Sequence, residues 1–86
     1  MYDILLTKEA QAFYDKADNP LAKRLNRCLE QLRREPHQHP SIKRLHGPLT
    51  GFFRYRIGDW RVVYRVDEDG AVVVILIITH RSSAYD

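Results

Sequence analysis

The sequence has few of the features that mark secreted or membrane proteins. It contains a single cysteine, so no disulfide can form within the chain, and we expect an intracellular, cytoplasmic compartment. The longest apolar run, Ala71 to Ile78, is far too short to span a bilayer. No basic region followed by an apolar core opens the chain, so we expect neither a signal peptide nor a membrane partner. Internal repeats and low-complexity tracts are also lacking.

The bulk composition predicts a small folded domain with a basic surface. A length of 86 residues indicates one domain, spanning 1–86, and such a chain buries only roughly 60–65% of its unfolded surface. The net charge is +3 and the pI is about 9.2, which fits a polyanionic partner without establishing one. Ten of the 14 cationic residues are arginine, whose guanidinium group binds phosphate through two parallel hydrogen bonds.

The stretch from Phe52 to Arg81 organises the chain, because two turn signals divide it into three strand-like runs. Gly58-Asp59 suits a type II′ hairpin turn, and residues 67–70 suit a type I turn closed by a left-handed Gly70. The runs on both sides of the first turn alternate between apolar and polar residues, so each predicts a strand with one core face and one solvent face. The last run, 71–79, is apolar at nearly every position and predicts a central strand buried on both faces.

A two-residue loop at the first turn fixes which side chains share a face. The apolar, aromatic face then holds the pairs Ile57–Trp60, Tyr55–Val62 and Phe53–Tyr64. The opposite face holds Arg56–Arg61, Arg54–Val63 and Phe52–Arg65, and is called the arginine face below. Like charges directly opposite each other destabilise a sheet, so we interpret this face as an anion-binding site; a solvated polar face is the alternative. A three-residue second loop puts Arg81 on this face, and one residue more or less brings in His80 instead.

The N-terminal third predicts a strand and a helical hairpin. Residues 2–6 form a short strand candidate, and Thr7 can cap a first helix with one buried face. Asn19 as N-cap and Pro20 at the first helical position begin a second helix, which ends near Arg34 or Glu35 because of the proline that follows. The apolar stripe of the second helix is Leu21, Leu25, Cys28, Leu29 and Leu32.

Two features of this region have competing interpretations. The thiol of Cys28 lies on the apolar stripe, where a core role is favoured over a nucleophilic one. The basic residues of the second helix lie mostly off the stripe and form either a partner surface or an ordinary solvated helix face.

The segment 36–51 reads as a long connection, with Ile42 and Leu45 tucked under the sheet edge. It contains His37 and His39, but nothing supplies further ligands at a recognisable spacing, so we expect no metal site. These elements together predict an α+β fold. A four-stranded, mainly antiparallel sheet packs against the N-terminal helical hairpin and leaves the arginine face open.

The C-terminal half resembles a known family. The run Lys43-Arg44-Leu45-x-Gly47, then FRYRIGDWRVVY at 53–64, then an apolar strand into His80-Arg81 and Tyr85, is similar to the RelE/ParE superfamily of toxins from toxin–antitoxin modules. The similarity covers nearly the whole chain. It implies a RelE-like microbial ribonuclease fold and a cognate antitoxin protein as partner. Arg81 followed four residues later by Tyr85 favours the RelE branch, whose members enter the ribosomal A site, cleave the mRNA codon there and inhibit translation.

The resemblance also implies a set of site residues and no cofactor. Arg61 matches the arginine after the hairpin turn, and the last strand supplies Arg81. Arg54 and Arg56 match basic positions that are often lysine in the RelE branch, and Thr79 stands where a glycine is common. The sixth candidate is His80, and the C-terminal tyrosine of the family matches Tyr85.

The chemistry expected of this set is cleavage by the ribose 2′-hydroxyl, with the ribosome orienting the mRNA. Arg61 and Arg81 are candidates to clamp the phosphate. The proton-transfer groups are Tyr85, whose ionised form nearby guanidinium groups would favour, and His80, since histidine titrates near neutrality; a structural role for His80 at the strand end is equally compatible. The alternatives to an endonuclease are a ParE-like DNA gyrase inhibitor without catalytic activity and a non-catalytic RNA-binding module.

Overall fold

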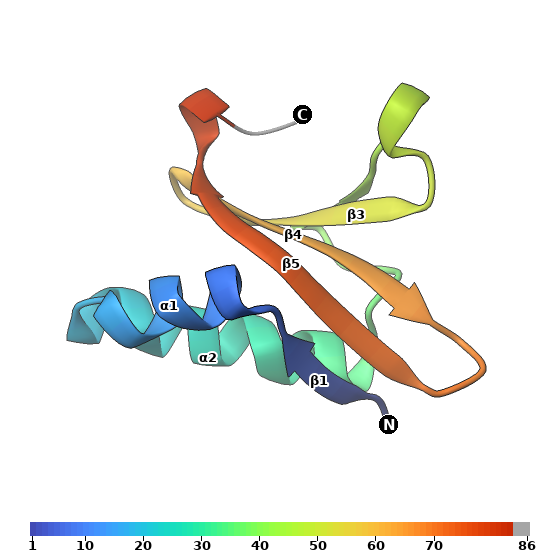
Figure 1. Cartoon of the computed structure of the whole chain (residues 1–86), viewed down its shortest axis with the longest axis horizontal. Coiled ribbons are helices and arrows are strands. Elements are labelled where there is room, and N and C mark those ends of the chain that lie inside the picture. Colours follow the sequence, from blue (N-terminus) through green and yellow to red (C-terminus); the bar gives the residue numbers. More distant parts are fainter. Residues whose placement is uncertain (84–86) are drawn as a thin grey trace.

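A computed structural model describes residues 1–83 as a sheet with two helices on one face (Figure 1). The strands run in the order β1-β5-β4-β3-β2; β1 is parallel to β5, and the other pairs are antiparallel. None of the helices in residues 1–83 is long and apolar enough to cross a membrane. The elements are β1 (Asp3–Leu6), α1 (Lys8–Lys16), α2 (Asn19–Arg34), β2 (Ile42–Arg44), the short 3-10 helix η1 (Gly47–Leu49), β3 (Phe52–Ile57), β4 (Trp60–Asp67), β5 (Val72–His80) and the 3-10 helix η2 (Arg81–Ser83).

The α+β class and the N-terminal helical hairpin are confirmed, but the sheet has five strands rather than four. The additional strand is β2, which pairs with the first part of β3 inside the segment expected to be a connection. Three residues are too few to show a period of two, so their sequence carries no strand signal. The burial expected beneath the sheet edge is present, because Leu45 is buried and Ile42 packs against the core.

The helix boundaries follow their capping residues. Thr7 caps α1 as predicted, because its Oγ1 accepts a hydrogen bond from the backbone N–H of Ala10 at 3.2 Å. The predicted cap of α2 was wrong by one residue. Asp18 caps this helix, with Oδ1 accepting from the N–H of Leu21 at 3.0 Å, so Asn19 is already helical. Asp and Asn are equally good caps, and therefore the sequence alone did not separate them.

The helices bury their apolar stripes against the apolar face of the sheet. Cys28 is completely buried at this interface, and burial raises the pKa of its thiol, which confirms the core role. The Tyr64 hydroxyl donates a buried 2.7 Å hydrogen bond to the carbonyl oxygen of Pro36 and fixes the chain where it leaves α2. The core consists of Ala10, Leu25, Cys28, Leu32, Phe53, Ile57, Val62, Tyr64, Val73, Ile75 and Ile78.

The hairpin of β4 and β5 differs from the prediction in its turn and in a bulge, and the extra residue of the turn and the extra residue of the bulge cancel in their effect on which face each side chain takes. Its left-handed residue is Ala71, with φ +52°, and Gly70 has no positive φ. Four residues separate the opposed pair Asp67 and Val72, one more than expected. A register shift then leaves Leu76 as an extra residue on β5. The bulge restores the predicted parity.

A hydrogen-bonded cluster ties the N-terminus and the end of α2 to this turn. The Tyr2 hydroxyl donates to Glu68 Oε1 at 2.8 Å, and His37 Nε2 lies 2.8 Å from Glu68 Oε2. The backbone N–H of His37 donates to Glu35 Oε1 at 2.8 Å. The Tyr2 bond, followed by the His37 contact, lowers the pKa of Glu68, and the backbone N–H of His37 is the main cause that lowers the pKa of Glu35.

Candidate functional site: the arginine face

The register predicted for the first hairpin is confirmed. Arg56 lies directly opposite Arg61, and all six predicted pairs occur in the β3–β4 ladder. Gly58 has φ +56° whereas Asp59 has no positive φ, which is the pattern of a type II′ turn. The arginine face is the side of the sheet away from α1 and α2, and η1 and η2 rise on that side (Figure 1). Lys43 of β2 joins this face because it pairs with Arg54.

Arg61 is the most buried charged side chain of the face, with only 7% of its surface exposed. Its Nη1 atom donates to the carbonyl oxygens of Gly58 at 2.9 Å and Trp60 at 3.1 Å. The side chain therefore folds back and holds the hairpin turn. These two carbonyl dipoles also offset part of the repulsion from Arg56, a contribution that neither the anion-binding interpretation nor the solvated-face alternative included.

Arg54 and Arg56 share one backbone anchor but differ in exposure. The Nη1 atom of Arg54 donates to the Ser41 carbonyl oxygen at 2.9 Å, and the side chain is half-buried. The backbone N–H of Arg56 donates to the same oxygen at 2.9 Å, while its residue is exposed. Arg56 is therefore more open to an incoming ligand than Arg54.

Arg81 comes to the same hairpin turn from the end of β5. Its backbone N–H donates to the Asp59 carbonyl oxygen at 2.7 Å, and its Nε atom lies 3.6 Å from Asp59 Oδ1, with 64% and 67% of the two side chains exposed. Because Arg61 holds the same turn, the fold gathers Arg56, Arg61 and Arg81 around one end of the sheet.

His80 lies on the other face of the sheet. It pairs with Trp60 at the edge of the helix-covered face, and the two rings make an edge contact with centroids 5.3 Å apart. Its Nδ1 atom accepts a hydrogen bond from the N–H of Ser82 at 3.3 Å. This placement favours the structural role at the strand end over proton transfer on the arginine face. The remaining site candidate, Tyr85, lies outside the described residues.

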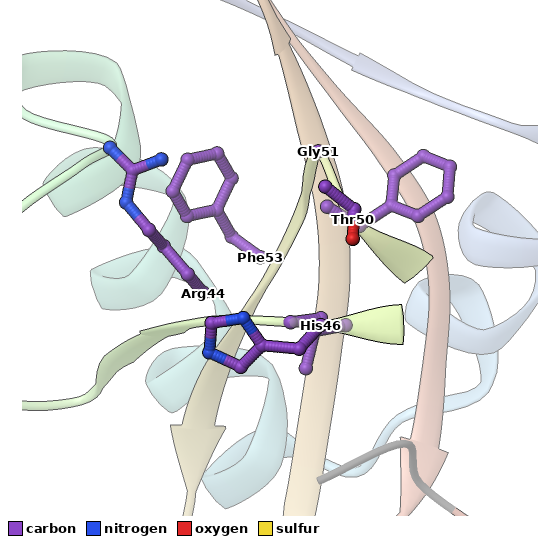
Figure 2. Close-up of a pocket in the computed structure, with 7 residues that line it drawn as sticks. Arg44, His46, Thr50, Gly51 and Phe53 are labelled. Atoms are coloured by element: carbon purple, nitrogen blue, oxygen red, sulfur yellow. The ribbon is translucent and has the colours of Figure 1, made fainter. Parts of the chain in front are cut away.

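A hollow of about 220 Å³ opens at the opposite end of β3. Figure 2 shows Arg44 extended beside the ring of Phe53, with His46 on the neighbouring segment; the Arg44 guanidinium carbon lies 5.2 Å from the Phe53 ring centroid. The sequence reasoning did not identify this hollow, because its walls come from the β2–β3 connection, whose path no periodicity predicted. None of the five candidate site residues that the structure describes lines it. Its lining comprises Arg44, Leu45, His46, Thr50, Gly51, Phe52 and Phe53.

Comparisons with known proteins connect this geometry to toxin families. Residues 4–85 match the family model of the ParE toxin of the type II toxin–antitoxin system parDE. The curated protein Toxin RelG of Mycobacterium tuberculosis is 42% identical over 43 residues, a match that spans 50% of this chain and 49% of RelG.

Two solved structures extend the similarity over nearly the whole chain. The toxin–antitoxin complex RelBE2 of M. tuberculosis contains a chain that is 31% identical, with a TM-score of 0.78 and coverage of 93% of this chain and 98% of that one. The archaeal RelE–RelB complex of Pyrococcus horikoshii contains a chain that is 26% identical, with a TM-score of 0.81 and coverage of 96% and 98%.

Proposed function

Because the chain belongs to the ParE toxin family of type II toxin–antitoxin systems, we propose that it acts as the toxin of such a module, and that it does so as a ribosome-dependent mRNA endonuclease. The observation that carries this proposal is the gathering of Arg56, Arg61 and Arg81 around the hairpin turn at one end of the sheet. Three guanidinium groups around one turn suit a phosphate group that gains charge during a reaction.

Each arginine has a distinct proposed role. Arg56 and Arg81, which are exposed, bind the scissile phosphate and stabilise the charge of the phosphorane. Arg61 holds the turn that brings them together and adds its own positive charge. Arg54 is fixed to Ser41 and contacts a neighbouring phosphate. Arginine is a poor general base because its pKa exceeds about 12, so the proton transfers need another group.

Tyr85 is the proposed proton-transfer residue. The strands of the arginine face, within residues 1–83, carry cationic, apolar or threonine side chains apart from Asp3 and Asp67 at the far end, and at the turn the Asp59 carboxylate faces Arg81. His80 lies on the opposite face and supports the strand end through Trp60 and Ser82. The ribosome orients the 2′-hydroxyl toward the phosphate.

Primer extension on cellular mRNA tests this function most simply. After expression of the chain, we expect cuts inside codons of translated reading frames and none in untranslated regions. Cuts in translated and untranslated regions alike would contradict the dependence on the ribosome. Intact mRNA in growth-arrested cells would contradict the endonuclease function.

The second candidate function is inhibition of DNA gyrase. It is favoured by one observation, that the family model matching 4–85 is named for ParE. If the chain inhibits gyrase, the purified protein blocks supercoiling by gyrase. Because such an inhibitor needs no catalytic residue, Arg81→Ala would then leave the pattern of mRNA cuts unchanged. Supercoiling assays run beside primer extension separate the two functions.

The proposed partner is a cognate antitoxin, as the solved complexes suggest by similarity. Leu5 shares its row of the sheet with Val74 and Arg65 on the arginine face, and its side chain is 58% exposed. A partner segment with apolar and acidic residues matches this surface. We expect expression of the chain to arrest growth, and a small acidic protein encoded by a neighbouring reading frame to relieve the arrest. Normal growth on expression without any partner would contradict the toxin assignment.

A further inference from the structure

Positive charge is concentrated in the middle of the sequence. Residues 19–58 contain nine lysines and arginines against two acidic residues, whereas the two flanking segments are each net acidic. No acidic residue occurs between Glu35 and Asp59. This basic segment includes α2 and β3, so its charge lies on both sides of the two-layer structure. The nine cationic residues are Lys23, Arg24, Arg27, Arg33, Arg34, Lys43, Arg44, Arg54 and Arg56.

A row of three basic residues follows the outer side of α2. Lys23, Arg27 and Arg34 are all exposed. At 3.6 residues per turn they fall within one narrow sector of the helix, opposite its buried stripe. None of the three forms an ion pair or side-chain hydrogen bond within residues 1–83, in contrast to Arg33, which lies 3.7 Å from Glu30.

Arg24 connects this row to the arginine face. Its Nη2 atom lies 2.8 Å from the point where a side-chain carbon would stand at Gly58, so the guanidinium group lies against the hairpin turn. Arg61 holds the same turn from the other side, and Arg81 is bonded to it. Positive charge therefore continues from the arginine face, around the turn, to the outer side of α2.

We propose that Lys23, Arg27 and Arg34, called the α2 basic row, bind the phosphate backbone of a second stretch of RNA, separate from the strand on the arginine face. This inference rests on the proposed function and adds that the protein is held between two RNA surfaces. Phosphate contacts need cations and no apolar core, whereas protein interfaces contain a buried apolar centre. The exposed residues of α2 include no apolar side chain except Pro20, so structured RNA fits this surface better than a protein.

A charge-neutralising pair of variants tests the proposal. Lys23→Gln/Arg27→Gln removes two charges from the α2 basic row, and Lys8→Gln/Lys16→Gln removes two from exposed positions of α1 as the matched control. Binding is measured to programmed 70S ribosomes whose A-site codon carries 2′-deoxyribose, so that no cleavage follows. We expect the α2 variant to bind about tenfold more weakly, and its slope of log affinity against log salt to fall by about 2, since each lost phosphate contact removes about one unit.

The outcomes separate this inference from the proposed function. If wild-type protein binds ribosomes and the two double variants bind equally well, with equal salt slopes, the α2 basic row is an ordinary solvated surface and the inference is wrong. If the α2 variant instead loses affinity for the antitoxin alone, the row is a protein interface and the inference is also wrong. If wild-type protein fails to bind ribosomes, the proposed function fails and the inference falls with it.

Discussion

The backbone N–H of Arg81 donates to the carbonyl oxygen of Asp59 at 2.7 Å, which fixes the end of β5 to the β3–β4 turn. The β4–β5 hairpin, residues 60–80, thus ends beside Arg56 and Arg61 through a backbone hydrogen bond that does not rely on side-chain contacts. The Asp59 carboxylate lies in the same place and faces the Arg81 guanidinium group at 3.6 Å. A phosphate that binds Arg81 has to compete with this carboxylate.

Removing that competitor should strengthen binding of RNA. Asp59→Asn keeps the backbone carbonyl that accepts from Arg81 and removes the negative charge. An exposed ion pair contributes about 0.2–1 kcal/mol, so affinity for programmed ribosomes should rise by up to about fivefold. Asp69→Asn, in the other hairpin turn, is the control and should have little effect. Weaker binding by the Asp59 variant would show that the carboxylate supports the site instead.

The β4–β5 turn offers a test of stability. Ala71 has φ +52°, a conformation that is about 1–2 kcal/mol unfavourable for a residue with a side-chain carbon. Ala71→Gly relieves this strain but gives the unfolded chain more freedom, which offsets about 0.4–1 kcal/mol. We expect a net gain of about 0.5–1 kcal/mol in the free energy of unfolding by urea denaturation. A loss of stability would mean that Ala71 contributes packing that outweighs its strain.

That turn also shows where reasoning from the sequence reached its limit. Gly58-Asp59 fixed the first hairpin, because only two residues connect the strands and Gly58 takes the positive φ that the turn needs. In the second turn glycine was again expected to be left-handed, but Ala71 takes that conformation. Once β4 and β5 pair along most of their length, tertiary packing selects the turn, and a local strain of this size is tolerated.

The candidate site was predictable to the extent that it depends on the first hairpin. The opposition of Arg56 and Arg61 followed from alternation and turn length alone. The fold-back of Arg61 onto its own turn and the contact of Arg24 with Gly58 did not, because rotamers and helix–sheet docking leave no periodic signal. The face on which His80 lies depended on the length of the second turn and on the bulge in β5, because one extra residue at either place moves every later side chain of β5 to the opposite face of the sheet.

Acid should weaken the cluster around Glu68. The pKa of Glu68 is below its ordinary value of 4.5, first because of the Tyr2 hydroxyl and then because of His37. A lowered pKa means that the stabilisation is complete above pH 4.5 and is lost as the pH falls through the folded-state value. Glu68→Gln should therefore be less stable than wild type near pH 7, and the difference should shrink as the pH falls below 4.5 in a series of urea titrations. A difference that does not change with pH would show that the carboxylate charge is not responsible.

Single-turnover cleavage on programmed ribosomes tests the central claim most directly, with Arg81→Ala and Tyr85→Phe compared with wild-type protein. We expect the cleavage rate to fall about 10²–10³-fold for Arg81→Ala, the usual effect of losing one donor to transition-state charge. For Tyr85→Phe we expect a fall of about 10²–10⁴-fold, the usual contribution of general acid–base catalysis. His80→Gln should have a much smaller effect, because His80 lies on the other face of the sheet. Near wild-type rates for both Arg81→Ala and Tyr85→Phe would contradict the proposed endonuclease site.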